Sequence, residues 1–128
     1  MRKPLVIGGL LLAQILGGAS ALVGPWEDGM ASYNRGDYAP AIRLFRPLAQ
    51  SGNAKAQHLI GVMYHRGQGV ARNTVRAMAW FNVAAKNGDR EAQASIGEVS
   101  KTMKPDEIAE ARDMAQACEA SDYRNCEY

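Results

Sequence analysis

Two histidines and two cysteines have the greatest capacity for chemistry in this sequence. His58 and His65 are seven residues apart, so they would share one face of a helix. Zinc ligands on one helix usually stand four residues apart, and no acidic or cysteine residue accompanies these histidines in sequence. The spacing therefore argues against a metal site, and we expect neither a metal nor another cofactor.

Cys118 and Cys126 are the two cysteines of the chain. An even cysteine count in an exported protein is typical of a disulfide, whereas a metal site needs more ligands at short spacing. We therefore predict a disulfide bond between Cys118 and Cys126, joining the end of the last helix to the C-terminal tail. In the loop-entropy description, so small a ring adds about 2–3 kcal/mol of stability.

Motifs for catalysis or phosphate binding are missing from the sequence. No serine or cysteine lies within a known nucleophile motif. Gly67-Gln68-Gly69 follows no strand pattern and precedes no Gly-Lys-Ser, so it is not a phosphate-binding loop. An acidic group near residue 106 fits the solvated face of a helix. We therefore expect no catalytic residues.

A repeat of 36 residues positions these side chains. Ala56-Gln57 recurs as Ala92-Gln93. Within one unit, apolar residues recur every three or four positions, as on one face of a helix, first over residues 56–67 and again over 77–85. Glycine-rich segments end both stretches, and Asn73 is placed to cap the second helix. The pattern predicts helix, glycine-rich loop, helix and turn.

The same unit recurs on both sides. Upstream, residues 33–52 repeat it with a loop five residues shorter, and Asp37 is expected to cap the second helix of that unit. Downstream, a third copy begins at Ala92. We predict six helices in three antiparallel pairs, with units of about 25–51, 54–87 and 90–120 and a tail of 121–128. The last helix lacks the Trp80-Phe81 pair, as expected of a capping element.

These motifs resemble a known family. Residues 54–70 read Ala-x-Ala-Gln-x-Leu-Ile-Gly-x-Met-Tyr-x-x-Gly-x-Gly-Val, and Ala-Met-x-Trp-Phe-x-x-Ala-Ala-x-x-Gly follows at 77–88. The pattern is similar to that of Sel1-like repeats, relatives of the tetratricopeptide repeat with a longer loop between the helices. The resemblance covers residues 26–99. It implies an all-α solenoid that binds proteins or peptides, often in exported bacterial proteins, and it implies no catalytic residues.

The N-terminus has the pattern of a secretory signal peptide over residues 1–21. Arg2 and Lys3 precede an apolar stretch at 5–16, and Ala19-Ser20-Ala21 is a cleavage motif. We expect cleavage after Ala21, which leaves a repeat domain of 22–128 in the periplasm or outside the cell, without stable membrane insertion. The alternative is a retained membrane anchor, but the apolar stretch is short for a span.

The distribution of charged residues along the sequence does not indicate a nucleic-acid partner. Without Arg2 and Lys3 the basic and acidic residues are equal in number, so the formal charge of +2 belongs to the leader. The middle of the chain is richer in Lys and Arg and the C-terminal part richer in Asp and Glu, but no basic stripe appears. We expect a protein or peptide partner in the cell envelope; the sequence does not specify the oligomeric state.

We expect partners to bind on the concave face, where the first helices of successive repeats lie side by side. Its residues follow from the repeat offset and form a groove of mixed polarity: Asn34, Lys55, His58, Val62, His65, Ala94, Glu98 and Lys101. The predicted function is a non-enzymatic interaction module, a small adaptor or regulator. The alternative is an enzyme or metal-binding protein, such as a hydrolase, of the cysteine-containing Sel1-like group. The members of that group carry a cysteine pair within each repeat, and this chain does not.

Overall fold

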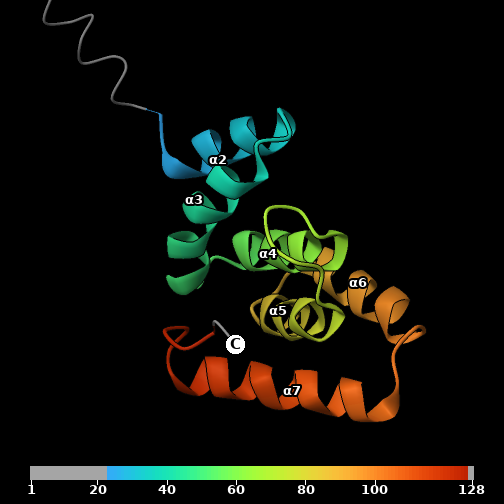
Figure 1. The fold of residues 1–128 in the computed structure, drawn as a ribbon. Coiled ribbons are helices and arrows are strands. Elements are labelled where there is room, and N and C mark those ends of the chain that lie inside the picture. Colours follow the sequence, from blue (N-terminus) through green and yellow to red (C-terminus); the bar gives the residue numbers. More distant parts are fainter. Residues whose placement is uncertain (1–22, 127–128) are drawn as a thin grey trace, which may run out of the picture.

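The computed structural model describes residues 23–126, and this part of the chain is all-α, as predicted (Figure 1). The expected signal peptide and its cleavage site at Ala21 lie outside the described residues. Six helices form within 23–126, and no strand is present among them: α2 (Pro25–Asn34), α3 (Tyr38–Gln50), α4 (Ala54–Arg66), α5 (Thr74–Lys86), α6 (Arg90–Ser100) and α7 (Pro105–Ala120).

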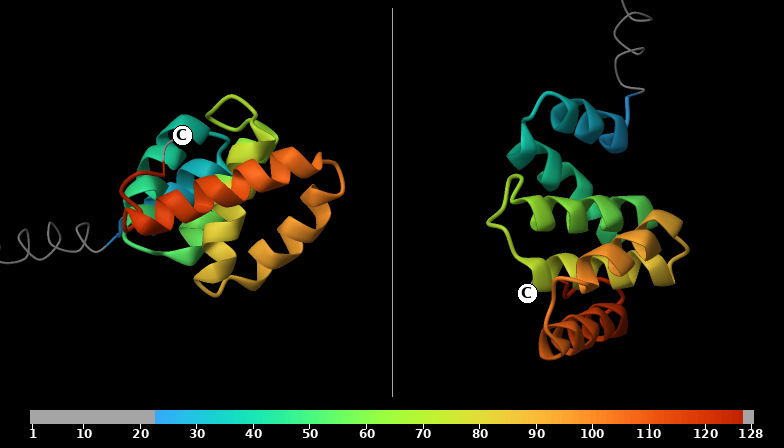
Figure 2. Two further views of the ribbon diagram at one scale, coloured as in Figure 1. Left: turned by 90° about the horizontal axis from the view of Figure 1, so that it is seen from below. Right: turned by 90° about the vertical axis from the view of Figure 1, so that its right-hand side faces the viewer.

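Helices α2 to α5 follow one another from one end of the molecule, α7 lies at the other end, and α6 lies beside α5 (Figures 1 and 2). Helix α2 packs on α3, α3 on α4, and α4 on α5. The third unit is arranged around the second, because α6 and α7 each pack on α5. The α5 helix is therefore the centre of the fold, and its residues from Ala77 to Phe81 are all buried.

Two glycines allow the paired helices to approach closely. A Cβ atom built on Gly29 of α2 would lie 2.6 Å from the Phe45 ring of α3. A Cβ atom on Gly61 of α4 would lie 2.6 Å from the Phe81 ring of α5. Both phenylalanines are at most 1% exposed. Each of the first two units therefore places an aromatic ring directly against the backbone of its first helix, which explains why glycine occupies these interior helical positions despite its low helix propensity.

Side-chain caps begin three of the helices. Asn53, Asn73 and Asp89 each accept a hydrogen bond from the backbone N–H three residues later, at 3.0, 2.9 and 2.8 Å. The predicted cap at Asn73 is confirmed. Asp37 also occupies an N-cap position, but its carboxylate makes no cap hydrogen bond and instead accepts from Arg35 Nε at 3.2 Å. At that position, the ion pair with Arg35 replaces the expected cap.

The glycine-rich loop between α4 and α5 folds back onto the preceding unit. Gly67 ends α4 in the left-handed conformation, with φ 68° and ψ 44°, which glycine adopts without steric cost. One residue later, Gln68 Oε1 accepts a hydrogen bond from the Tyr33 hydroxyl at 3.0 Å. Asn73 N–H donates to the Tyr64 carbonyl at 2.9 Å and closes the loop. The longer loop of the second unit thus connects it to α2.

The C-terminal tail is attached to the other helices through a disulfide and a chain of hydrogen bonds. Cys118 and Cys126 form the predicted disulfide, and both are buried. Within the ring that it closes, the Tyr123 hydroxyl donates to Asn87 Oδ1 at 3.0 Å. Asn87 Nδ2 donates to Gln57 Oε1 at 2.9 Å, and Gln57 Nε2 donates to the Ala49 carbonyl at 3.0 Å. This chain connects the tail to the ends of α5 and α3 and fixes the buried side chain of Gln57 on α4.

Candidate functional site

Half of the predicted binding residues line one hollow between α4 and α6. Val62 and His65 come from α4, and Ala94 and Glu98 from α6, with Phe81 at the base and Ser95 beside it. We call this space, of about 260 Å³, the α4–α6 hollow. The structure therefore brings four of the eight side chains together, because the repeat preserves the register between successive first helices.

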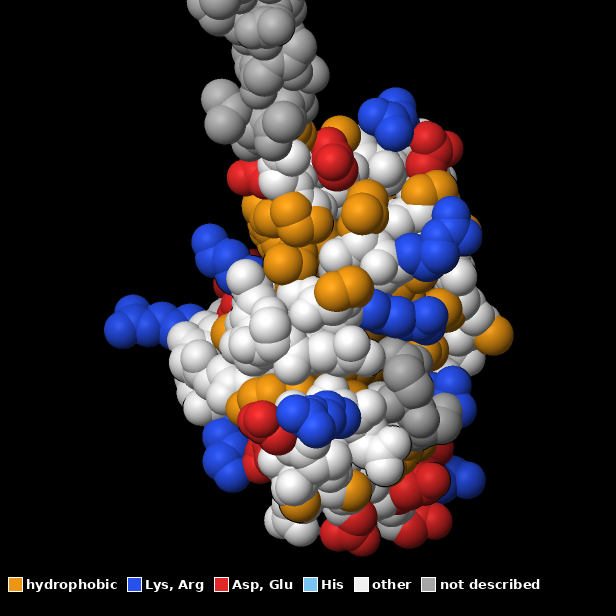
Figure 3. Space-filling view, turned by 90° about the vertical axis from the view of Figure 1, so that its left-hand side faces the viewer, with side chains coloured by type: hydrophobic (Ala, Val, Ile, Leu, Met, Phe, Trp, Pro, Cys, Tyr) orange, Lys and Arg blue, Asp and Glu red, His pale blue; other side chains and the backbone are white. Residues whose placement is uncertain are grey.

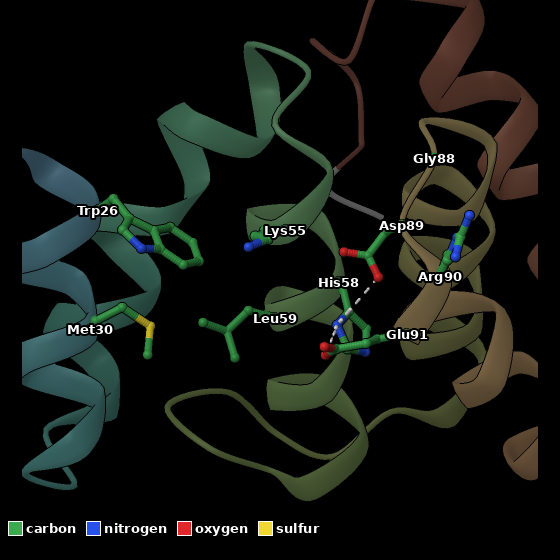
Figure 4. Close-up of a pocket in the computed structure, with 9 residues that line it drawn as sticks. All are labelled: Trp26, Met30, Lys55, His58, Leu59, Gly88, Asp89, Arg90 and Glu91. Carbon is green, nitrogen blue, oxygen red and sulfur yellow. Dashed lines mark ion pairs between the residues drawn. The ribbon is translucent and has the colours of Figure 1, made fainter.

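Lys55 and His58 line a second, larger hollow of about 410 Å³ (Figure 4). Its apolar side chains are Trp26 and Met30 of α2 and Leu59 of α4. The rim on the far side consists of residues 88–91, where α6 begins. We call this space the α2–α4 hollow. Its apolar side chains were not among the predicted binding residues.

The remaining two predicted residues line neither of these hollows. Asn34 is the last residue of α2 and is exposed. Lys101 is the residue that follows α6, and its Nζ lies 3.4 Å from Glu98 Oε1. Both side chains stand near the ends of their helices, so they could contribute only to the edges of a binding surface.

The two hollows follow one another along α4. Lys55, His58 and Leu59 line the first, and Val62, His65 and Arg66 line the second. These positions are one helical repeat of seven residues apart, so they form a continuous stripe on the same face of α4. A partner lying along this stripe would contact both hollows.

His58 lines the α2–α4 hollow and joins α4 to α6. Its Nε2 lies 3.1 Å from Ser95 Oγ, and its Nδ1 lies 3.9 Å from both Asp89 Oδ1 and Glu91 Oε2. The ring also packs against Phe81, with centroids 5.5 Å apart. The sequence analysis found no acidic partner for this histidine, because the partners lie more than thirty residues away in the chain. The sequence indicated these partners only indirectly, because the 36-residue repeat places the start of α6 beside the start of α4.

A serine, a histidine and a carboxylate together suggest nucleophilic catalysis, but the geometry does not support it. The 3.9 Å between His58 Nδ1 and Asp89 Oδ1 exceeds a hydrogen bond, and this oxygen already accepts from Ala92 N–H at 2.8 Å. Ser95 lies within α6, where backbone N–H groups are used by the helix and none is available as an oxyanion donor. We therefore assign His58 and Ser95 a structural role, holding α6 against α4.

Three further features of the described residues concern metal ligands, membrane-spanning helices and the pKa of Lys86. No three His, Cys, Asp or Glu side chains between residues 23 and 126 are grouped as a metal site would require. Among the same residues, no helix combines the length and apolar character needed to cross a bilayer. The pKa of Lys86 is raised because its ammonium donates to Glu119 Oε2 at 2.6 Å, but this pair joins α5 to α7 away from both hollows.

On the face shown in Figure 3, charged side chains of both signs are present. On the face shown in Figure 3, Lys and Arg side chains stand singly among acidic and uncharged ones, and hydrophobic side chains appear between them. This face has no continuous basic stripe of the kind that follows a nucleic-acid backbone.

Comparison with known proteins agrees with the repeat pattern. The Sel1 repeat family matches residues 54–89, which include α4, the glycine-rich loop and α5. The chain is a Sel1-like repeat protein. Sel1 repeats generally mediate interactions between proteins. In this Sel1-like repeat protein, the matched unit supplies the stripe on α4 that lines both hollows.

A curated relative shares the repeats. The ERAD-associated E3 ubiquitin-protein ligase component HRD3A of Arabidopsis thaliana is 36% identical over 74 residues, which cover 57% of the Sel1-like repeat protein. The same residues span 11% of the relative, so the likeness concerns a short part of a much longer protein.

Proposed function

We propose that this Sel1-like repeat protein is a non-enzymatic interaction module, an adaptor or regulator that binds a protein or peptide segment along α4. The observation that carries the proposal is the continuous stripe on α4 with a hollow at each half. An extended segment placed along this stripe could insert side chains at two successive sites, which is how repeat proteins obtain affinity from shallow surfaces.

The test compares two substitutions that each introduce a glutamate. Val62→Glu places a carboxylate within the α4–α6 hollow, where Val62 is half-buried. Arg43→Glu changes an exposed residue of α3 that lines neither hollow. We expect Val62→Glu to weaken capture of partners from a cell-envelope extract while the melting temperature stays near that of the wild type. Arg43→Glu should leave capture unchanged. Equal loss from both variants, or no loss from Val62→Glu, would contradict the proposal.

We also infer that the protein is exported to the periplasm or beyond. The N-terminal pattern of residues 1–21 supports export, and the Cys118–Cys126 disulfide fits an oxidising compartment. The intact mass of the protein purified from the periplasmic fraction checks both features. We expect a chain that begins at Leu22 and lacks the two thiol hydrogens. A mass that includes residues 1–21 would contradict cleavage, and alkylation of two thiols would contradict the disulfide.

A further inference from the structure

The α2–α4 hollow has the apolar interior of a binding site. Trp26 and Met30 face Leu59 across it, from α2 and α4 respectively (Figure 4). All three side chains are partly buried against the core, and the Trp26 ring packs on Phe45 with centroids 5.4 Å apart. The hollow is therefore held open by side chains whose positions the core fixes. Its volume of about 410 Å³ is at the small end of ligand pockets, which suits one or two side chains of a partner.

The cationic and the acidic side chains around this hollow differ in the contacts that they make. Lys55 and Arg90 line it, are exposed, and make no ion pair or hydrogen bond with the described residues. In Figure 4 the Lys55 side chain extends towards Trp26. Of the two carboxylates of the rim, Asp89 is held by the start of α6, whereas the Glu91 side chain is 88% exposed. Asp89 caps α6 through Ala92 N–H and is 8% exposed, and both Asp89 and Glu91 lie 3.9 Å from His58 Nδ1. Two cations thus remain available to a ligand beside an apolar interior.

We propose that the α2–α4 hollow binds an acidic, apolar peptide segment, in which a large aliphatic side chain is flanked by carboxylates. The aliphatic side chain enters between Trp26, Met30 and Leu59, and the carboxylates meet Lys55 and Arg90. This inference rests on the proposed interaction function and specifies the chemistry of the partner at one of its two hollows. Charge complementarity of this kind mainly determines which partners are accepted and how fast they associate.

Tryptophan fluorescence provides a direct readout of this hollow. The protein contains two tryptophans: Trp26 lines the hollow, and Trp80 is 2% exposed in the core. A ligand entering the α2–α4 hollow should therefore change the emission of Trp26 and leave that of Trp80 nearly constant. The probe is the peptide Gly-Asp-Leu-Asp-Leu-Asp-Gly, and its matched control has lysine in place of each aspartate. We expect saturable binding of the acidic peptide and none of the basic one.

Charge reversal of the two cations tests the assignment within the protein. Lys55→Glu with Arg90→Glu should weaken binding of the acidic peptide by at least about tenfold, because like charges would then face each other across the rim. The control variant, Arg43→Glu with Arg112→Glu, makes the same change in net charge at exposed positions that line neither hollow. It should retain nearly all of the affinity. Melting curves of both variants check that the fold is kept.

Three results would overturn this inference. They are equal binding of the acidic and basic peptides, equal loss from the two double variants, and a peptide-induced emission change that persists after Trp26→Phe. Its failure is distinguishable from failure of the proposed function. If Val62→Glu abolishes partner capture while Lys55→Glu with Arg90→Glu captures normally, the interaction function stands and the assignment of the α2–α4 hollow is wrong.

Discussion

Adding one methyl group at Gly61 tests whether the approach of α4 to α5 is as close as the structure shows. In Gly61→Ala the new Cβ would lie 2.6 Å from both Cδ1 and Cε1 of Phe81, and 3.2 Å from the Ala77 carbonyl oxygen. Carbon atoms pack best at about 3.5–4.0 Å, so the ring must move by about 1 Å. Phe81 is 1% exposed and surrounded by the core, so this movement displaces other side chains. Such overpacking costs about 1–3 kcal/mol.

The higher helix propensity of alanine acts against this steric cost. Alanine is a better helix former than glycine by about 1 kcal/mol, so part of the steric cost is offset. The repeat provides a control for this term in Gly97, which stands 36 residues after Gly61. A Cβ on Gly97 meets no atom within 4 Å. Gly97→Ala should therefore show only the gain in helix propensity.

The measurement is thermal unfolding of both variants followed by far-ultraviolet circular dichroism. The free energies of unfolding of the two variants should differ by about 1–3 kcal/mol, with Gly97→Ala the more stable. Since each kilocalorie per mole shifts the melting temperature of a domain this size by about 4–8 °C, the two curves should be clearly separated. Equal melting temperatures, both above that of the wild type, would show that α4 has room for a methyl group and would refute the close contact with Phe81.

Two further predictions concern polar contacts. Gln57→Ala should lower the free energy of unfolding by about 2–4 kcal/mol, because it removes one buried and one partly buried hydrogen bond and leaves a cavity. Chemical denaturation measures this change, and Gln93→Ala, at the exposed equivalent position, should stay within about 0.5 kcal/mol of the wild type. The Lys86–Glu119 pair should stabilise the fold at pH values below 10.5, the ordinary pKa of lysine, and this contribution should be lost as the pH rises through the raised pKa of Lys86. The stability difference between wild type and Glu119→Gln should therefore shrink at alkaline pH; a difference that is constant through this range would contradict the linkage.

The positions of all six helices could be predicted from the sequence. The predicted units of about 25–51, 54–87 and 90–120 each contain two helices of the structure. These boundaries are local properties: apolar spacing defines the faces, and glycine, proline and capping residues define the ends. The disulfide was likewise predictable, because the chain has two cysteines and an export signal pattern.

The binding surface was predictable only in part. The repeat offset grouped Val62 and His65 with Ala94 and Glu98, and these four residues line one hollow in the structure. It did not group Trp26 and Met30 with Leu59. Which half-buried apolar residues remain open to a partner depends on the gap between those helices, and that gap is set by side chains from the whole core.

Equivalent residues of the repeat show most clearly what the tertiary structure decides. Gln57 and Gln93 follow the same motif, and so do Gly61 and Gly97. Gln57 is fully buried and bonded to Ala49 and Asn87, whereas Gln93 is exposed. The sequence alone determined the repeat, the helices and their apolar faces, because these depend on residues close together in the chain. Only the tertiary structure decided which copy of each residue is enclosed, because enclosure requires closely packed neighbours on both sides. Helix α4 packs against both α3 and α5, whereas α6 packs mainly against α5 and meets α4 at the His58–Ser95 contact.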